Sequence, residues 1–347
     1  MLCAAWPQIE GSLASTRRVA ELFLEGFHGN YGALTRPSWI ARWTGLAENH
    51  CVVAASNVQG GASEQAIEAW LCALTAFEVA RRLADDSVPE NANVSAKVDA
   101  SMQTFTPLLH ELERVRIVGC EQGEFHSYYL SAARPGLCAP AVICISNEDE
   151  TEATLLARLL PVVIGRSTSI LVVAHSSISN DWPGQSELIL SCCFDYLSAR
   201  PDVDATRIGV YGEGWSAVLA TNFALAERRV AAAVCDGGLW NWARTQAFND
   251  WMMNATSAID ESTLSRRRSR LARQLKCPVL VVAGGRGMVS VPEAIKLEAD
   301  CAEAGVDLEL AMPRMTRTSV GEFENFVAAD ECIFEWLGRK LTRRSAL

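Results

Sequence analysis

The chain has 347 residues, of which 49% are hydrophobic and 21% are charged, and its formal net charge at pH 7 is −10. This negative balance argues against a nucleic-acid partner, because the phosphates would be repelled. No run reaches the roughly 18 apolar residues of a membrane helix, and the N-terminus lacks the pattern of a signal peptide, so we expect a cytoplasmic protein without a membrane partner.

The first third of the chain has a helical pattern. Apolar residues recur at helical spacing over residues 16–27, 63–84 and 95–112, and no strand-like alternation interrupts them. Proline and turn residues at 85–91 separate two of these helices. We therefore predict a helical domain over residues 1–112.

Short β-rich runs alternate with helical ones in the rest of the chain. The first two runs are predicted to form a hairpin, and the others are nearly all apolar, as strands covered by helices on both faces must be. The fold class is therefore α/β, with a doubly wound, mostly parallel sheet. The predicted strands are 114–120, 125–132, 141–146, 169–175, 207–212, 230–236, 277–284 and 308–313.

Ligands of such sheets bind beyond the carboxyl ends of the strands, which places the expected site in the loops that follow them. Residues 239–274 are rich in tryptophan and have little strand character, which predicts an inserted lid. Trp182, Trp215 and Trp240 fall near strand ends and this lid. They either line an apolar ligand cavity or contribute to ordinary packing.

Cysteine usage gives no sign of a disulfide framework or a metal site. None of the twelve cysteines forms a C-x-x-C pair, and most lie in apolar stretches. We expect buried free thiols, no bound metal and no cofactor.

Residues 207–216, Arg-Ile-Gly-Val-Tyr-Gly-Glu-Gly-Trp-Ser, resemble the strand, sharp turn and helix in which α/β-hydrolases carry G-x-S-x-G. Segments 70–83, 200–212 and 276–284 are similar to the branch that contains the fermentation-respiration switch proteins and 2,6-dihydroxypseudooxynicotine hydrolase. The resemblance implies an α/β-hydrolase core over 113–347 behind an N-terminal helical cap. It also implies a ligand pocket between cap and core, and a homodimer.

The resemblance fails at all three positions of the catalytic triad. Gly214 stands in the place of the nucleophilic serine, Gly287 in that of the acid and Arg317 in that of the histidine. Glycine has no side-chain atom that can attack a carbonyl, and all five histidines precede the turn at Gly214. Hydrolysis by the family's serine nucleophile is therefore not expected.

Several residues near this turn have a structural and a functional interpretation. Gly214 either leaves room for a ligand or marks the decay of a superfluous site, whereas the backbone N–H of Trp215 would still point into the pocket. Ser216 could be a displaced nucleophile, but two helical positions turn it by about 200° from Gly214, which favours a packing role. Asn147 followed by Glu150 has the pattern of a helix cap.

Charged groups near the strand ends are the remaining candidates. His175, Glu213 and Asp236 could act as general acid and base on a bound keto compound, or could be structural strand-end residues. Arg286 and Arg317 could bind a ligand carboxylate, or could lie in solvent at the rim.

Three functional hypotheses follow. The first is a non-hydrolytic enzyme, a cyclase, lyase or decarboxylase, that acts on a small keto or aromatic, polyketide-like metabolite. The second is a catalytically silent pseudoenzyme that binds a small molecule or a protein partner. The third is an ester or C–C bond hydrolase with a non-standard nucleophile such as Ser216 or Cys235.

Overall fold

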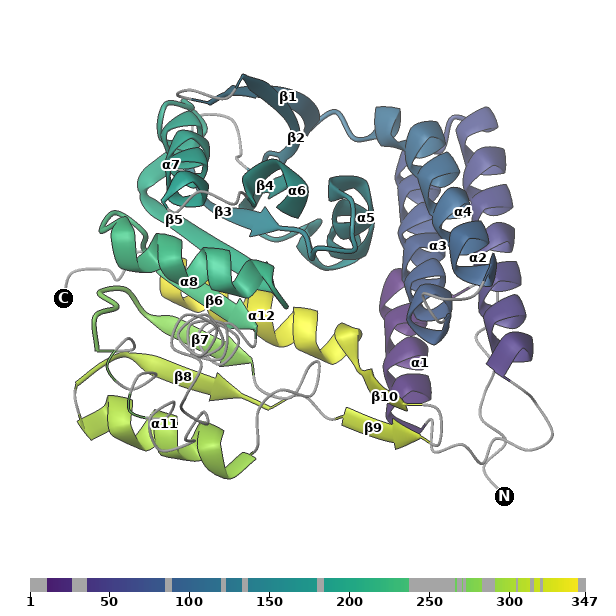
Figure 1. Cartoon of the computed structure of the whole chain (residues 1–347). Coiled ribbons are helices and arrows are strands. Elements are labelled where there is room, and N and C mark those ends of the chain that lie inside the picture. Colours follow the sequence, from purple (N-terminus) through teal and green to yellow (C-terminus); the bar gives the residue numbers. More distant parts are fainter. Residues whose placement is uncertain are drawn as a thin grey trace. The chain divides into compact units, whose positions relative to one another are not determined.

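The structure is a computed structural model, and the chain folds into two compact units (Figure 1). The first unit comprises Met1–Leu112, Ala153–Ile164 and Arg314–Glu331, and the second comprises the remaining segments. The structure describes residues 11–26, 36–84, 89–119, 123–132, 137–179, 184–236, 266, 270, 273–282, 291–303, 305–312, 315–318 and 321–342.

Helices form most of the first unit, and one of them lies at its centre. Helix α3 packs against α1, α2 and α4, and its residues from Ala69 to Ala80 are all buried. Since this stretch is apolar around most of its circumference, the helix needs neighbours on several sides. The elements are α1 (Leu13–Gly26), α2 (Arg36–Gln59), α3 (Ser63–Leu83), α4 (Pro89–Phe105), the short 3₁₀ helix η1 (Thr106–Leu108), α5 (Glu152–Val163), β9 (Met315–Thr318) and β10 (Gly321–Glu324).

A group of buried charges lies within this helical unit. The Glu78 carboxylate accepts hydrogen bonds from Arg81 at 2.7 Å and from Arg82 at 2.8 Å. Arg158 of α5 lies 3.7 Å from the Asp330 carboxylate, and both side chains are almost completely buried. Burial alone would raise the pKa of Glu78, but the neighbouring arginines outweigh it and lower the pKa to about 2.

An eight-stranded sheet, in the order β1-β2-β4-β3-β5-β6-β7-β8, is the basis of the second unit. Strand β2 runs antiparallel to β4, and the strands from β4 to β8 pair in parallel. This arrangement confirms the predicted α/β class with a mostly parallel sheet. The strands are β1 (Leu112–Val118), β2 (Glu124–Leu130), β3 (Ala139–Ile145), β4 (Ser169–Val173), β5 (Val203–Glu213), β6 (Ala232–Asp236), β7 (Val279–Val282) and β8 (Leu308–Ala311).

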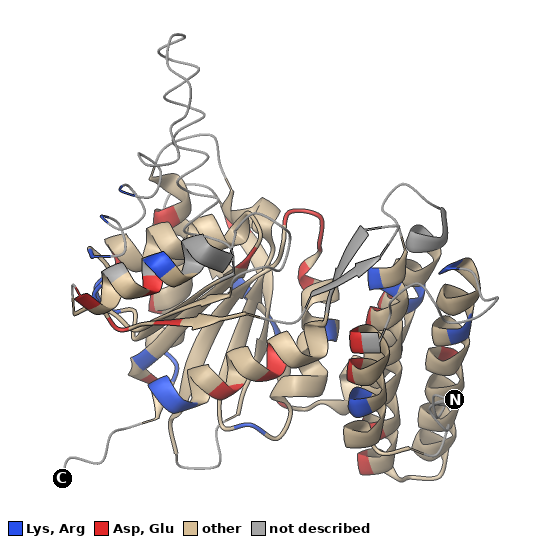
Figure 2. Ribbon diagram, turned by 90° about the horizontal axis from the view of Figure 1, so that it is seen from below, with Lys and Arg blue, Asp and Glu red and all other residues tan. Residues whose placement is uncertain are grey.

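Helices cover both faces of the sheet, which explains why its central strands are almost free of charge (Figure 2). Helices α7 and α8 pack on one face, where the rings of Phe194 and Phe223 lie 6.4 Å apart. On the other face, Gly209 of β5 leaves room for Leu337 and Leu341 of α12. The helices of this unit are α6 (His175–Ile178), α7 (Gln185–Ser198), α8 (Ser216–Ala226), α11 (Val291–Glu303) and most of α12 (Phe326–Leu341).

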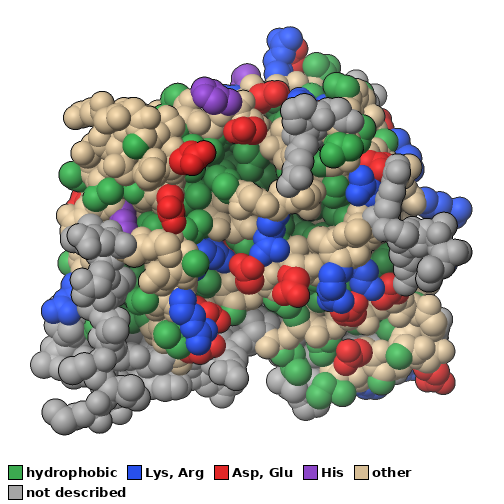
Figure 3. Space-filling view, turned by 180° about the vertical axis from the view of Figure 1, so that it is seen from behind, with side chains coloured by type: hydrophobic (Ala, Val, Ile, Leu, Met, Phe, Trp, Pro, Cys, Tyr) green, Lys and Arg blue, Asp and Glu red, His purple; other side chains and the backbone are tan. Residues whose placement is uncertain are grey.

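Charges of both signs share the surface. On the face shown in Figure 3, Lys and Arg side chains lie beside Asp and Glu side chains. Opposite charges also pair at the end of α12, where Lys340 lies 2.8 Å from Asp307 and 2.9 Å from Glu309. Among the described residues, no helix combines the length and apolar character needed to cross a bilayer.

Candidate functional site

The turn between β5 and α8 has the backbone of a sharp strand-to-helix elbow. Gly214 adopts a left-handed conformation with φ +59°, which costs a residue with a side chain about 1–2 kcal/mol. At Gly212, a Cβ atom would overlap the backbone carbonyl of Ser216. Glycine at 212 therefore allows the chain to double back closely, as the elbow motif requires.

The strand order makes this elbow the place to look for a ligand. After β3 the chain adds β4 on one side, and then returns to add β5 on the other side of β3. The carboxyl ends of β3 and β5 thus form the topological switch point of the sheet. Ser146 and Asn147 follow β3, and Gly214 follows β5.

Asn147 occupies the space in which a side chain at position 214 would lie. A Cβ atom built on Gly214 would lie 2.6 Å from Asn147 Oδ1 and 3.3 Å from its Cγ. Asn147 is only 2% exposed, and its Oδ1 accepts no hydrogen bond from the residues that the structure describes. Because the oxygen and nitrogen of an amide have similar volumes, the obstruction holds for either orientation of the side chain.

The interpretation of Asn147 as a helix cap is therefore wrong. Helix α5 begins only at Glu152, and Asn147 lies in the turn before it, where its carbonyl accepts from Glu150 N at 3.1 Å. The side-chain amide is directed at the elbow instead of at an α5 backbone N–H.

His175 and Ser216 form a second feature of the same edge. His175 is the first residue of α6, two residues beyond the end of β4. Its Nδ1 lies 2.7 Å from Ser216 Oγ, and Ser216 Oγ also donates to the carbonyl oxygen of Ser146. The His175 backbone N–H donates to Ser146 Oγ at 3.0 Å. Burial lowers the pKa of His175 below its ordinary value of 6.5, with Asp149 partly opposing the shift, so the ring is neutral at pH 7.

This pair differs from the serine and histidine of a hydrolytic triad. Ser216 is 0% exposed, so no substrate carbonyl can approach its oxygen. In a triad the serine faces Nε2 and a carboxylate holds Nδ1, whereas here the serine faces Nδ1. Asp149 acts on His175 only through its charge.

Solved structures match this chain along most of its length. The crystal structure of 2,6-dihydroxy-pseudo-oxynicotine hydrolase matches with a TM-score of 0.59 and 19% sequence identity, over 93% of this chain and 95% of that one. The acylaminoacyl peptidase of Pyrococcus horikoshii matches with a TM-score of 0.50 and 14% identity, over 71% of this chain and 45% of the peptidase. The chain has the α/β-hydrolase fold.

The resemblance seen in the sequence is thus confirmed at the level of the α/β-hydrolase fold. No protein-family model matches the chain, and no curated protein matches it. That Gly214 stands in the place of the nucleophile of this fold stays a prediction; the structure shows Gly214 and the Asn147 side chain within contact distance at the strand-to-helix turn.

Glu213 ends β5 of the α/β-hydrolase core, beside Asp236 at the end of β6. It is 5% exposed and accepts a hydrogen bond from the Tyr211 hydroxyl at 3.2 Å. In the described part of the chain, no hydrogen bond or ion pair joins Glu213 to His175. The side chain of Asp236 lies outside the described residues, so its part in an acid–base cluster stays a prediction.

Three of the six predicted ligand-binding residues, Trp182, Trp240 and Arg286, lie outside the described part of the structure. So do Gly287, predicted to stand in the place of the acid, and almost all of the predicted lid. Arg317 lies in β9, where its backbone pairs with Glu322 of β10, but its side chain is not described. Trp215 precedes α8 and is 42% exposed.

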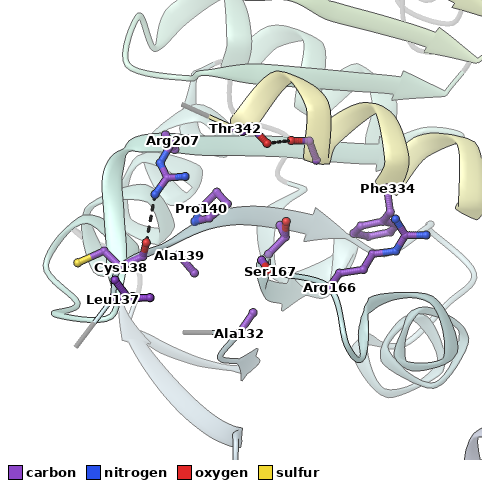
Figure 4. A pocket seen from close by; sticks show the side chains of 12 residues that line it. Ala132, Leu137, Cys138, Ala139, Pro140, Arg166, Ser167, Arg207, Phe334 and Thr342 are labelled. Atoms are coloured by element: carbon purple, nitrogen blue, oxygen red, sulfur yellow. Dashed lines mark hydrogen bonds between the residues drawn. The ribbon is translucent and has the colours of Figure 1, made fainter. Parts of the chain in front are cut away.

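A cavity of about 540 Å³ lies at the opposite edge of the sheet (Figure 4). It is bounded by the segments that precede β3 and β4, by Arg207 of β5 and by Phe334 of α12. Arg207 already donates to Asp204 at 2.8 Å and to the Cys138 carbonyl at 3.1 Å. This edge carries the amino ends of the parallel strands, whereas ligands of doubly wound sheets bind at the carboxyl ends.

Proposed function

We propose that this protein is a non-hydrolytic enzyme with the α/β-hydrolase fold, of the lyase, cyclase or decarboxylase type. Its substrate would be a small keto or aromatic, polyketide-like metabolite bound at the carboxyl edge of the sheet. The observation that carries the proposal is the position of Asn147, which lies 2.6 Å from where a side chain on Gly214 would begin. An acyl-enzyme intermediate at the elbow has neither an attacking atom nor space.

The chemistry that fits the remaining groups is proton transfer next to a carbonyl. His175 is neutral at pH 7, and within the described residues nothing hydrogen-bonds its Nε2. A neutral imidazole with a free lone pair suits a general base. The amide N–H groups at the start of α8 could stabilise the enolate oxygen that forms when the proton leaves.

The other possible nucleophiles do not support a hydrolase. Ser216 and Cys235 are both 0% exposed, so neither reaches a substrate carbonyl. A silent ligand-binding protein is the second candidate, because an elbow filled by Asn147 also suits binding without reaction.

Hydrogen–deuterium exchange tests proton transfer without knowledge of the full substrate. The wild-type protein is incubated in D₂O with aromatic methyl ketones, and deuterium incorporation next to the carbonyl is followed by NMR. We expect exchange above the buffer rate and a loss of about 100-fold or more in His175→Gln, which removes the base. His126→Gln is the matched control, because His126 is exposed on β2.

Equal rates of exchange in His175→Gln and wild type would refute the role of His175 as the general base. Ketone binding without exchange would favour the silent binder. The same preparation is treated with a fluorophosphonate probe, for which we expect no covalent label; stoichiometric labelling of Ser216 would show a serine hydrolase instead.

A further inference from the structure

The hydrogen bonds around Ser216 determine where each proton lies. Its Oγ is 2.7 Å from His175 Nδ1 and also contacts the carbonyl oxygen of Ser146. A carbonyl oxygen can only accept, so the single hydroxyl proton of Ser216 is donated to Ser146. The proton between Ser216 and the imidazole must then come from Nδ1.

We propose that Ser216 is a positioning residue that holds His175 in the tautomer with its proton on Nδ1 and its lone pair on Nε2. The hydroxyl accepts from the imidazole, which is the reverse of the serine–histidine hydrogen bond in a hydrolase. This inference rests on the proposed function, in which Nε2 removes a proton from the substrate.

A second set of hydrogen bonds holds the backbone of the same histidine. The His175 N–H donates to Ser146 Oγ at 3.0 Å, and Ser146 Oγ donates to the Glu150 carbonyl at 2.8 Å. In both chains of hydrogen bonds an N–H group of His175 donates to a serine hydroxyl, which donates to a backbone carbonyl. Because the carbonyl can only accept, the direction of donation cannot be reversed in either chain.

The alternative ring states lose contacts. Rotating the ring by 180° would present a C–H group to Ser216, and moving the proton to Nε2 would place two acceptor lone pairs against each other. A neutral ring is required for Nε2 to act as a base, and burial lowers the pKa of His175 in that direction. Ser216 and Ser146 are 0% exposed, so water does not compete for these hydrogen bonds.

Nitrogen-15 NMR of the full-length protein with labelled histidine reads the tautomer directly at neutral pH. The His175 signals are identified by their loss in His175→Gln. We expect wild-type His175 to carry its proton on Nδ1. In Ser216→Ala the acceptor is gone, and the tautomer ratio should shift toward Nε2–H by about tenfold, the equivalent of one buried hydrogen bond.

Ser198→Ala is the matched control, because Ser198 also donates to a backbone carbonyl, that of Phe194, at 2.9 Å. It should leave the His175 signals unchanged. A wild-type spectrum with the proton on Nε2, or an unchanged ratio in Ser216→Ala, would overturn the inference. The wild-type spectrum alone is decisive if Ser216→Ala does not fold.

The exchange assay separates this inference from the proposed function. If the tautomer responds to Ser216→Ala but His175→Gln exchanges normally, the positioning role stands and the proposed reaction fails. If His175→Gln loses exchange while the wild-type proton lies on Nε2, His175 still takes part in proton transfer, but the roles assigned to Ser216 and to Nε2 fail.

Discussion

Gly214 and Asn147 constrain each other at the elbow. Gly214 is tolerated in its left-handed conformation because it has no side chain, and Asn147 lies in the space that this leaves. The buried Oδ1 of Asn147 has no hydrogen-bond partner among the described residues, which costs about 1–3 kcal/mol. The two residues should therefore show a measurable coupling in stability.

A double-mutant cycle measures this coupling. Gly214→Ala should lower the free energy of unfolding by about 2–4 kcal/mol, because the methyl group adds an overlap to the cost of the backbone conformation. Asn147→Ala should change it by less than about 1 kcal/mol, since a lost contact is offset by removal of an unpartnered oxygen. The double variant should recover about 1–2 kcal/mol of the cost of Gly214→Ala.

Gly165→Ala is the control for the backbone cost alone. Gly165 has φ +85°, and a Cβ atom there would meet nothing within 4 Å. Urea denaturation of wild type, the three variants of the cycle and Gly165→Ala supplies the free energies. Strictly additive effects at Gly214 and Asn147 would contradict the steric account.

The sequence predicts only part of this site. The prediction that Gly214 stands in the place of a nucleophile rests on a local motif, and the position of His175 near a strand end follows from the apolar run before it. The pairing of Asn147 with Gly214 and that of His175 with Ser216 join residues far apart in the chain, which local patterns do not reveal. A polar residue directly after an apolar strand at the switch point was the available signal for Asn147.

At the scale of elements, short runs of apolar residues in the sequence predict the strands of the sheet well. Every predicted strand has a counterpart. The strands from β3 to β8 were recognisable as short, mostly apolar runs, as buried parallel strands are, whereas β1 and β2 were predicted as a hairpin. The predicted helix over 95–112 extends too far, since Pro107 lies in the 3₁₀ turn that follows α4 and β1 begins at Leu112. The pair β9 and β10 was not predicted, because the sequences Met-Thr-Arg-Thr and Gly-Glu-Phe-Glu lack the apolar run of a buried strand.

Glu78 of helix α3 should make the stability of the fold sensitive to acid. Glu78 has a lower pKa in the folded protein, about 2, than the ordinary 4.5 of a free side chain. Its contribution to stability is therefore complete above about pH 4.5 and is lost as the pH falls toward 2. Glu78→Gln should destabilise the protein by about 3 kcal/mol at pH 7, because it leaves buried arginines without their carboxylate.

Thermal unfolding from pH 7 to pH 3 tests this assignment. The difference between wild type and Glu78→Gln should stay constant down to about pH 4.5 and then narrow. Glu64→Gln, an exposed change on the same helix, should follow wild type throughout. A difference that does not depend on pH would show that the Glu78 charge contributes nothing.

At the scale of the whole molecule, burial should determine thiol chemistry. Most of the described cysteines are buried, whereas Cys138 and Cys332 are exposed. Burial of its sulfur raises the pKa of Cys332, and complete burial raises that of Cys193 much further. Since the thiolate is the reactive form, a cysteine whose pKa is raised further by burial should be alkylated more slowly.

We expect iodoacetamide to label Cys138 first, Cys332 more slowly and Cys193 only after unfolding. Peptide mass spectrometry of native and guanidinium-treated protein measures the three rates. Labelling of Cys193 in the native protein at the rate of Cys138 would contradict the packing of α7 on the sheet.

The asparagine that follows β3 also bears on protein engineering. A serine introduced at 214 would have its Cβ atom 2.6 Å from the Asn147 side-chain oxygen, so this amide must shift or be shortened to make room. Redesign of the turn to carry a side chain therefore begins at 147.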